Sequence, residues 1–211
     1  MKVVIFNGSP NKSGNTYHGI KMVADELQKE GIETEIIHVG NKFIRGCIAC
    51  GYCTKNKNGK CAITTDLVND WIEKMKDADG IILGSPVHYS AIAGTMKSFL
   101  DRAFRVAEAN DSMLRHKVGA AVVAVRRTGG TSTFDQLNNY INHSEMLIPT
   151  SNYWNIINGR LPGEAMKDEE GIQIMRILGK NIAWLMKLVE NGRGTIKEPE
   201  MEKKIFTNFI S

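Results

Sequence analysis

The chain has 211 residues, of which 42% are hydrophobic and 24% are charged, a composition typical of a folded globular protein that excludes wholesale disorder. No apolar run reaches the roughly 18 residues that a membrane-spanning helix needs. The short apolar stretch at the N-terminus indicates a first strand rather than a signal peptide. We therefore expect a cytoplasmic protein that does not bind membranes.

Two features of the composition bear on function. The formal net charge is +4, with 27 Lys and Arg against 23 Asp and Glu. Short basic runs and an aromatic content of 7% argue against a nucleic-acid partner, and the charge suits a protein that binds small phosphorylated ligands. All four cysteines lie between positions 47 and 61, which in a cytoplasmic chain favours metal or redox chemistry over disulfides.

Segments with the periodicity of strands and of helices alternate along the chain. Strands are predicted at 2–7, 33–39, 80–83, 120–125 and within 147–157, the third being broken at Gly84-Ser85-Pro86. Helices are predicted at about 16–30, after a capping Asp66, at about 93–106, near 134–144 and along the apolar stripe from Ile172 to Val189. Residues 193–211 are polar and are expected to form a C-terminal tail or arm.

This alternation predicts an α/β fold in which a parallel sheet is covered by helices on both faces. Right-handed crossovers and five strands favour a flavodoxin-like, three-layer, doubly wound sheet with the strand order 2-1-3-4-5. We expect residues 1–192 to form a single domain with a cysteine-rich loop at 46–62. Ligands of such sheets bind beyond the carboxyl ends of the strands, so the informative loops follow the first, third and fourth strands.

The loop after the first strand ends at a helix N-terminus, where unpaired N–H groups and the helix dipole favour a phosphate. Hydroxyl and amide side chains supply further donors, at Ser9, Ser13, Asn15 and Thr16. The loop lacks the Lys-Ser/Thr pair of a P-loop and the G-x-G-x-x-G of a dinucleotide site. It therefore suits a cofactor monophosphate, and a plain helix cap is the alternative interpretation.

The loops after the third and fourth strands suit the flat ring of a cofactor. In the first of them Pro86 is rigid, His88 is either a general acid or a surface residue, and Tyr89 is a candidate ring neighbour. In the second, Gly129-Gly130 lets the backbone approach a ligand closely. Arg126-Arg127 either contacts the phosphate of an incoming nucleotide or is solvated charge.

In this order the sequences GSPNKSGNT, GSPVHYSAIAGTMKSFLDR and VRRTGGTS make residues 1–155 resemble the NADPH-dependent FMN reductase family, which has the flavodoxin-like fold. The resemblance implies FMN as cofactor, NAD(P)H as electron donor, and a homodimer or homotetramer. It also implies that the flavin carries the chemistry, so that no catalytic residue is expected from the protein. The implied FMN contacts are Ser9, Asn11, Ser13, Asn15 and Thr16 on the phosphate, and Pro86, Val87, His88, Tyr89, Thr128, Gly129 and Gly130 on the ring.

The cysteines have the compact spacing C-x2-C-x2-C-x7-C, formed by Cys47, Cys50, Cys53 and Cys61. Three thiols at this interval can wrap one face of an iron–sulfur cubane, whereas zinc sites more often use two separated C-x-x-C knuckles. The spacing and its place after the second strand resemble the iron–sulfur flavoprotein subgroup, which implies a [4Fe–4S] cluster beside the FMN. Metal-free thiols and zinc are the alternatives.

The resulting hypothesis is an FMN-dependent oxidoreductase that takes a hydride from NAD(P)H. It passes the electrons to a small acceptor such as a quinone or a flavin or, through the cluster, to a redox partner. The alternative is a flavodoxin-like electron carrier or redox-sensing flavoprotein without enzymatic activity, and a pI near 8.8 disfavours the carrier because flavodoxins are typically acidic. The segment 152–164 is a lid, a dimer arm or ordinary packing.

Overall fold

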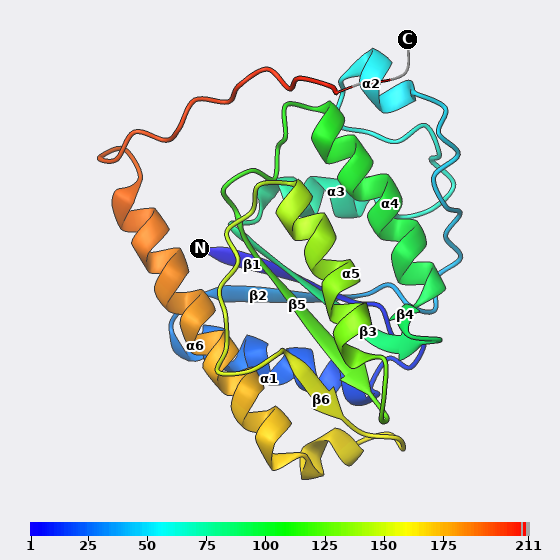
Figure 1. The fold of residues 1–211 in the computed structure, drawn as a ribbon, viewed down its shortest axis with the longest axis vertical. Coiled ribbons are helices and arrows are strands. Elements are labelled where there is room, and N and C mark those ends of the chain that lie inside the picture. The colour runs from blue at the N-terminus through cyan, green and yellow to red at the C-terminus, as the bar shows by residue number, and fades with distance from the viewer. Residues whose placement is uncertain (208, 210–211) are drawn as a thin grey trace.

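The computed structural model describes residues 1–207 and 209, and its chain alternates strands and helices around one central sheet (Figure 1). The strands are β1 (Lys2–Asn7), β2 (Glu33–His38), β3 (Gly80–His88), β4 (Ala91–Ile92), β5 (Val118–Val125) and β6 (Ile156–Asn158). The helices are α1 (Asn15–Lys29), α2 (Tyr52–Asn56), α3 (Val68–Asp77), α4 (Gly94–Ala109), α5 (Gly130–His143) and α6 (Glu169–Gly192), with a 3-10 turn, η1 (Glu164–Lys167).

The main strands are parallel in the order β2-β1-β3-β5-β6, and the short β4 pairs antiparallel with the end of β3. Because β6 is the last strand of the parallel sheet, this is the order that the sequence predicts, and the flavodoxin-like α/β fold is confirmed. The carboxyl ends of the strands share one edge. There Asn7 of β1 lies beside Gly84 of β3, and Pro86 lies beside Ala124 of β5.

Helices cover both faces of the sheet and form two hydrophobic cores (Figure 1). Alternate strand residues point to opposite faces, so that Val4 and Phe6 pack with α3, α4 and α5. Val3 and Ile5 pack with α1 and α6 on the other face. Strand β5 is buried over its whole length, as expected of a central parallel strand. The buried strands give the loops at the carboxyl edge a rigid base.

Strand β2 ends one residue before its predicted end, β5 begins two residues before its predicted start, and two other strands differ more from the prediction. The third strand does not break at Gly84-Ser85-Pro86 but continues to His88, paired with β5 as far as Pro86. Strand β1 ends beside Gly84 and β4 pairs only with Val87 and His88, so Pro86 has a paired strand on one side only, and a residue without an N–H is tolerated there. The fifth strand occupies only Ile156–Asn158, because Pro149 and a polar stretch interrupt the predicted range.

The observed helices agree with the predicted apolar stripes more closely than the observed strands agree with their predicted boundaries. Helix α5 begins at Gly130, earlier than predicted. Its first turn is polar, so apolar periodicity does not reveal where the helix starts. Asp66 precedes α3, and its Oδ1 accepts the Val68 N–H at 3.2 Å. In the described part of the chain no helix combines the length and the apolarity that crossing a bilayer requires.

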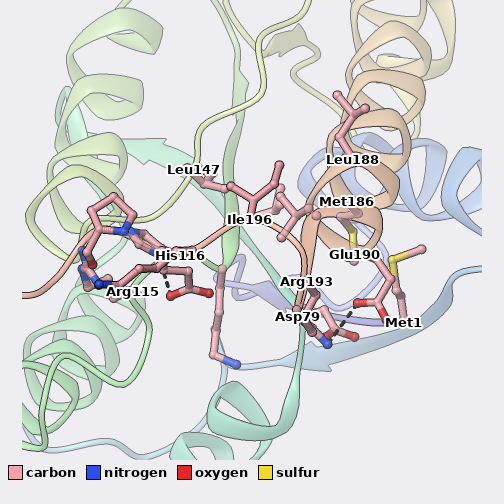
Figure 2. Close-up of a pocket in the computed structure, with 18 of the residues that line it drawn as sticks. Met1, Asp79, Arg115, His116, Leu147, Met186, Leu188, Glu190, Arg193 and Ile196 are labelled. Atoms are coloured by element: carbon pink, nitrogen blue, oxygen red, sulfur yellow. Dashed lines mark hydrogen bonds and ion pairs between the residues drawn. The ribbon is translucent and has the colours of Figure 1, made fainter.

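The residues that follow α6 cross the amino edge of the sheet and then run toward α2 (Figure 1). The described part of this tail forms neither helix nor strand. Arg115 donates to the Pro199 carbonyl at 3.0 Å, and His116 Nδ1 lies 3.0 Å from the Glu198 carboxylate. Under the crossing lies a cavity of about 700 Å³, toward which Ile196 and Met186 point (Figure 2). This cavity lies at the edge opposite the predicted ligand loops.

Candidate functional site

The loop between β1 and α1 is held in place by side chains from the sheet. The Ser9 N–H donates to Asn7 Oδ1 at 3.1 Å, and the Asn11 N–H donates to Ser9 Oγ at 3.2 Å. His38, at the end of β2, donates its Nε2–H to the Ser9 carbonyl at 2.8 Å. These contacts fix the start of the predicted phosphate loop, and no local sequence pattern points to the role of His38 in it.

Two glycines pack against the same loop. A Cβ on Gly40, just after β2, would lie 2.1 Å from the Ser9 carbonyl oxygen. A Cβ on Gly8 would lie 2.7 Å from Cβ of Met96. Both distances are far below van der Waals contact, so the loop is packed too closely to admit a side chain at either position. The only sequence signal at Gly40 is a glycine after a strand, which is too common to mark a site.

Helix α1 begins without a cap. Gly14 supplies no capping side chain, and the first turn carries no acidic residue. Within residues 1–207 and 209, we find no protein acceptor for the backbone N–H groups of Asn15, Thr16 and Tyr17. Three such N–H groups at the positive end of a helix fit a phosphate. The plain-cap alternative is therefore disfavoured, because no side chain caps this helix.

The predicted phosphate ligands differ in their availability. Ser9 and Thr16 are buried, whereas Asn11 and Ser13 are exposed. The side chain of Asn15 is engaged elsewhere, since Nδ2 donates to the Leu161 carbonyl at 3.0 Å and Oδ1 accepts the Ala165 N–H at 3.1 Å. Asn15 thus joins the segment 152–164 to the start of α1, and its backbone N–H is the group that it offers to a phosphate.

The second and third predicted loops contact one another at the same edge. Tyr89 and Ser90 form the two-residue turn between β3 and β4, with φ of 50° and 58°. The Ser90 carbonyl accepts the Ser132 Oγ–H at 2.6 Å. Gly129, with φ of 85°, lies so close that a Cβ there would be 2.7 Å from Ser90 Oγ. The structure thus brings residues 86–89 beside residues 128–130, with Tyr89 fully exposed at the tip.

The four cysteines lie in the segment between β2 and α3, which contains only the short helix α2. Cys47 and Cys50 are exposed, Cys53 and Cys61 are partly buried against the core, and none forms a disulfide. The described residues contain no group of three or more metal-ligating side chains positioned to hold an ion. The donor set has the chemistry of an iron–sulfur site, but its thiols are not gathered around one point.

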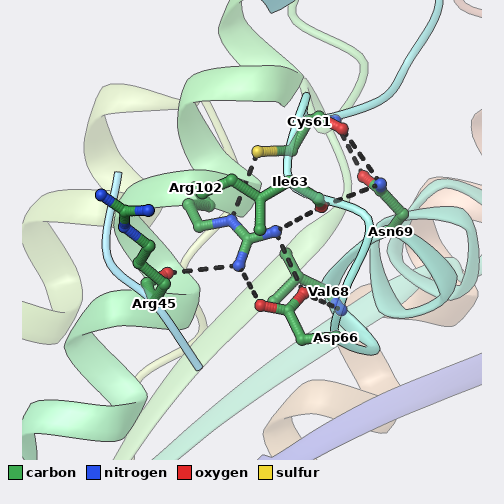
Figure 3. A network of polar contacts seen from close by, with 7 residues as sticks. All are labelled: Arg45, Cys61, Ile63, Asp66, Val68, Asn69 and Arg102. Carbon is green, nitrogen blue, oxygen red and sulfur yellow. Dashed lines mark hydrogen bonds and ion pairs between the residues drawn. The ribbon is translucent and has the colours of Figure 1, made fainter. Parts of the chain in front are cut away.

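A buried arginine contacts both ends of this segment (Figure 3). Arg102 of α4 donates from Nε to Cys61 Sγ at 3.3 Å and makes a bidentate pair with the Asp66 carboxylate. It also donates to the Arg45 carbonyl at 3.2 Å and to the Ile63 carbonyl at 2.9 Å, so all five of its N–H groups are used. Burial alone would lower the pKa of Arg102, but the Asp66 carboxylate and the Cys61 sulfur outweigh burial and raise the pKa above its ordinary value.

Comparison with known sequences identifies the family. The sequence model of the NADPH-dependent FMN reductase family matches residues 1–160, which is most of the chain. The chain belongs to this family. Its membership confirms the resemblance that the three loops indicate.

Individual relatives of this FMN reductase family member agree with the assignment. An iron–sulfur flavoprotein of Methanocaldococcus jannaschii is 38% identical over 199 residues, which cover 90% of this chain and 100% of the relative. RosB, solved with bound 8-demethyl-8-formylriboflavin-5′-phosphate, superposes with a TM-score of 0.68 at 16% identity, over 100% of this chain and 98% of RosB. An archaeal flavodoxin superposes with a TM-score of 0.59 at 16% identity, over 89% of this chain and 99% of the flavodoxin. The two solved structures share the fold alone.

Proposed function

We propose that this protein binds FMN at the carboxyl edge of its sheet, oxidises NAD(P)H, and passes the electrons to a small acceptor such as a quinone or a free flavin. One observation carries the proposal. The uncapped N-terminus of α1 lies at the same edge as the paired ring loops, so that one ligand with a phosphate and a flat ring can contact both. Bound FMN supplies the redox chemistry, and the protein binds it and orients the two substrates.

The residues of the chain divide this work between them. Backbone N–H groups at positions 15–17 bind the phosphate, with Ser13 as an exposed hydroxyl donor beside them. Residues 86–89 and 128–130 bind the ring, and the contact of Gly129 with Ser90 keeps the two ring loops together. Arg126 and Arg127 are exposed next to this platform and contact the phosphates of the incoming nucleotide.

Anaerobic stopped-flow spectroscopy tests the reductase activity. NADPH or NADH is mixed with the FMN-loaded protein, and bleaching of the flavin absorbance is expected within the first turnover. Replacing Arg126 and Arg127 together by Gln is expected to raise the nucleotide concentration at half-maximal bleaching about tenfold, with little change in the limiting rate. Flavin that dithionite reduces but neither nucleotide reduces would establish the electron-carrier alternative instead.

We also propose that Cys47, Cys50, Cys53 and Cys61 hold a [4Fe–4S] cluster through which electrons reach a one-electron redox partner. The proposal is supported by the donor set and by the iron–sulfur flavoprotein that is 38% identical. After anaerobic purification, about four iron and four sulfide are expected per chain. Replacing Cys50 by Ser is expected to remove the cluster and to leave flavin bleaching intact. A flavin spectrum with no iron refutes the cluster.

A further inference from the structure

We infer that Arg102 is the positioning residue of the cysteine segment: it fixes Cys61 in place before any metal binds, and the other three thiols close onto Cys61. The first half of this inference concerns the chain alone. The second half rests on the proposed cluster.

The four thiols are held very unequally. The Cys61 N–H donates to Asn69 Oδ1 at 2.8 Å, and the Cys61 carbonyl accepts from Asn69 Nδ2 at 3.0 Å. The sulfur accepts the Nε–H of Arg102. Cys61 is therefore fixed through its backbone and its side chain, whereas Cys47 and Cys50 are exposed. Cys53 is partly buried against the core, but within the described residues Cys61 has the only sulfur with a hydrogen-bond partner. The donor set is therefore complete in chemistry but open in geometry.

Arg102 also contacts the chain at both ends of the segment. The Arg45 carbonyl lies two residues before Cys47, and Asp66 lies five residues after Cys61. Asp66 Oδ1 further accepts the Val68 N–H, so one guanidinium joins α4, the segment and the start of α3 (Figure 3). A lysine has no fixed fork and only three donors, so it cannot reproduce these contacts.

An N–H donor on a ligand sulfur stabilises the more negatively charged state of a cluster, and so raises its reduction potential. Loss of the Arg102 Nε–H is therefore expected to shift the potential of a loaded cluster to a more negative value. This readout does not depend on turnover of the enzyme.

The test compares Arg102→Lys with Arg105→Lys. Arg105 lies on the same helix and donates to Thr54 Oγ1 at 3.1 Å, so it contacts the cysteine segment without contacting a sulfur. Hydrogen exchange is measured on iron-free protein. In Arg102→Lys the amides of Cys61 and Val68 are expected to exchange about tenfold faster, while Arg105→Lys leaves them unchanged. Wild-type exchange at both amides in Arg102→Lys overturns the inference.

Two further measurements keep the result decisive. If Arg102→Lys does not fold, Asp66→Asn takes its place, because it removes the ion pair but keeps an acceptor atom. This variant is expected to speed hydrogen exchange at the amides of Cys61 and Val68. Unchanged exchange at both amides then overturns the inference. After anaerobic reconstitution, Arg102→Lys is expected to hold less iron and sulfide than Arg105→Lys, or to hold a cluster of more negative potential. Wild-type protein that takes up no iron refutes the proposed cluster, while exchange still decides the role of Arg102.

Discussion

Tyr89 and Ser90 have left-handed backbones at the tip of the ring platform, a conformation that costs a residue with a side chain about 1 kcal/mol or more. The turn is held by α5, because Ser132 and Gln136 both donate side-chain hydrogen bonds to the Ser90 carbonyl. These hydrogen bonds hold the strained turn, and with it the backbone of the exposed Tyr89, beside the proposed flavin ring.

Replacing Ser90 by Gly is expected to raise the free energy of unfolding by roughly 0.5–1 kcal/mol, since glycine adopts this backbone without strain and the Ser90 carbonyl contacts remain. Urea unfolding measures the change. Ala91→Gly is the matched control, because Ala91 is paired in β4, and it is expected to lower stability by a similar amount. Destabilisation by Ser90→Gly would show that the turn is not strained.

Glu35 on β2 accepts a hydrogen bond from Lys74 and lies 3.2 Å from Lys2 Nζ. The Lys74 hydrogen bond holds the pKa of Glu35 below its ordinary value of 4.5. A carboxyl whose pKa is lower in the folded state stabilises the fold above pH 4.5, and this contribution disappears as the pH falls through the lowered pKa.

Glu35→Gln is therefore expected to be less stable than wild type by up to about 1 kcal/mol near pH 7, and equally stable in strong acid. Urea unfolding of both proteins across this pH range checks the sign. Glu33→Gln serves as control, since Glu33 is more exposed and lies 3.5 Å from Lys2, and it is expected to change the stability near pH 7 less than Glu35→Gln does. A difference that grows toward acid would contradict the assignment.

At the scale of single elements, the start of α1 has opposite requirements in the free and the loaded protein. A free helix N-terminus is stabilised by a negative side chain, whereas a bound phosphate is repelled by one. Ser13→Asp is expected to leave the thermal midpoint of the apoprotein unchanged or higher, and to weaken FMN binding about tenfold or more. Fluorescence titration with FMN measures the affinity, and the neutral Ser13→Asn is the control. Equal affinity of the two variants would place the phosphate elsewhere.

The elements that the sequence predicts well are those in which one buried face gives the apolar residues a regular spacing. Helices α1 and α6 each present one apolar face to the sheet, and their stripes predict them directly. Helix α2 has no buried residue and five residues in all, so it leaves no periodic signal. The continuation of β3 through Pro86 depends on where β1 ends. That end is set by tertiary pairing and cannot be predicted from the local sequence around Pro86.

The parts of the candidate site that can be predicted from the sequence are those with a local signal. The loops after the first, third and fourth strands are recognisable because small residues and turn residues gather there. The role of Arg102 is not recognisable, because its partners lie 36 to 57 residues away in the chain. Asn15 fits the predicted donor pattern, yet its side chain binds a segment 146 residues further on.

At the scale of the whole molecule, the two edges of the sheet differ in character. The carboxyl edge carries the ligand loops, and the amino edge is crossed by the tail. Truncation after Pro199 is expected to change the free energy of unfolding by less than about 0.5 kcal/mol, because the described residues among those removed are exposed and make only surface contacts. Truncation after Arg193 also removes the Pro199 and Glu198 contacts and uncovers the 700 Å³ cavity, and is expected to cost about 1–2 kcal/mol. Chemical unfolding compares the two, and equal stability would show that the crossing contributes nothing.

Cys47 and Cys50 expose free thiols to solvent, and neither forms a disulfide. Exposed thiols oxidise in air and cross-link through intermolecular disulfides. Molecules handled without reductant will therefore accumulate covalent dimers that have nothing to do with a packed interface. Sedimentation or light scattering gives the native assembly only under reducing, oxygen-free conditions, and gel electrophoresis with and without thiol separates the two kinds of dimer.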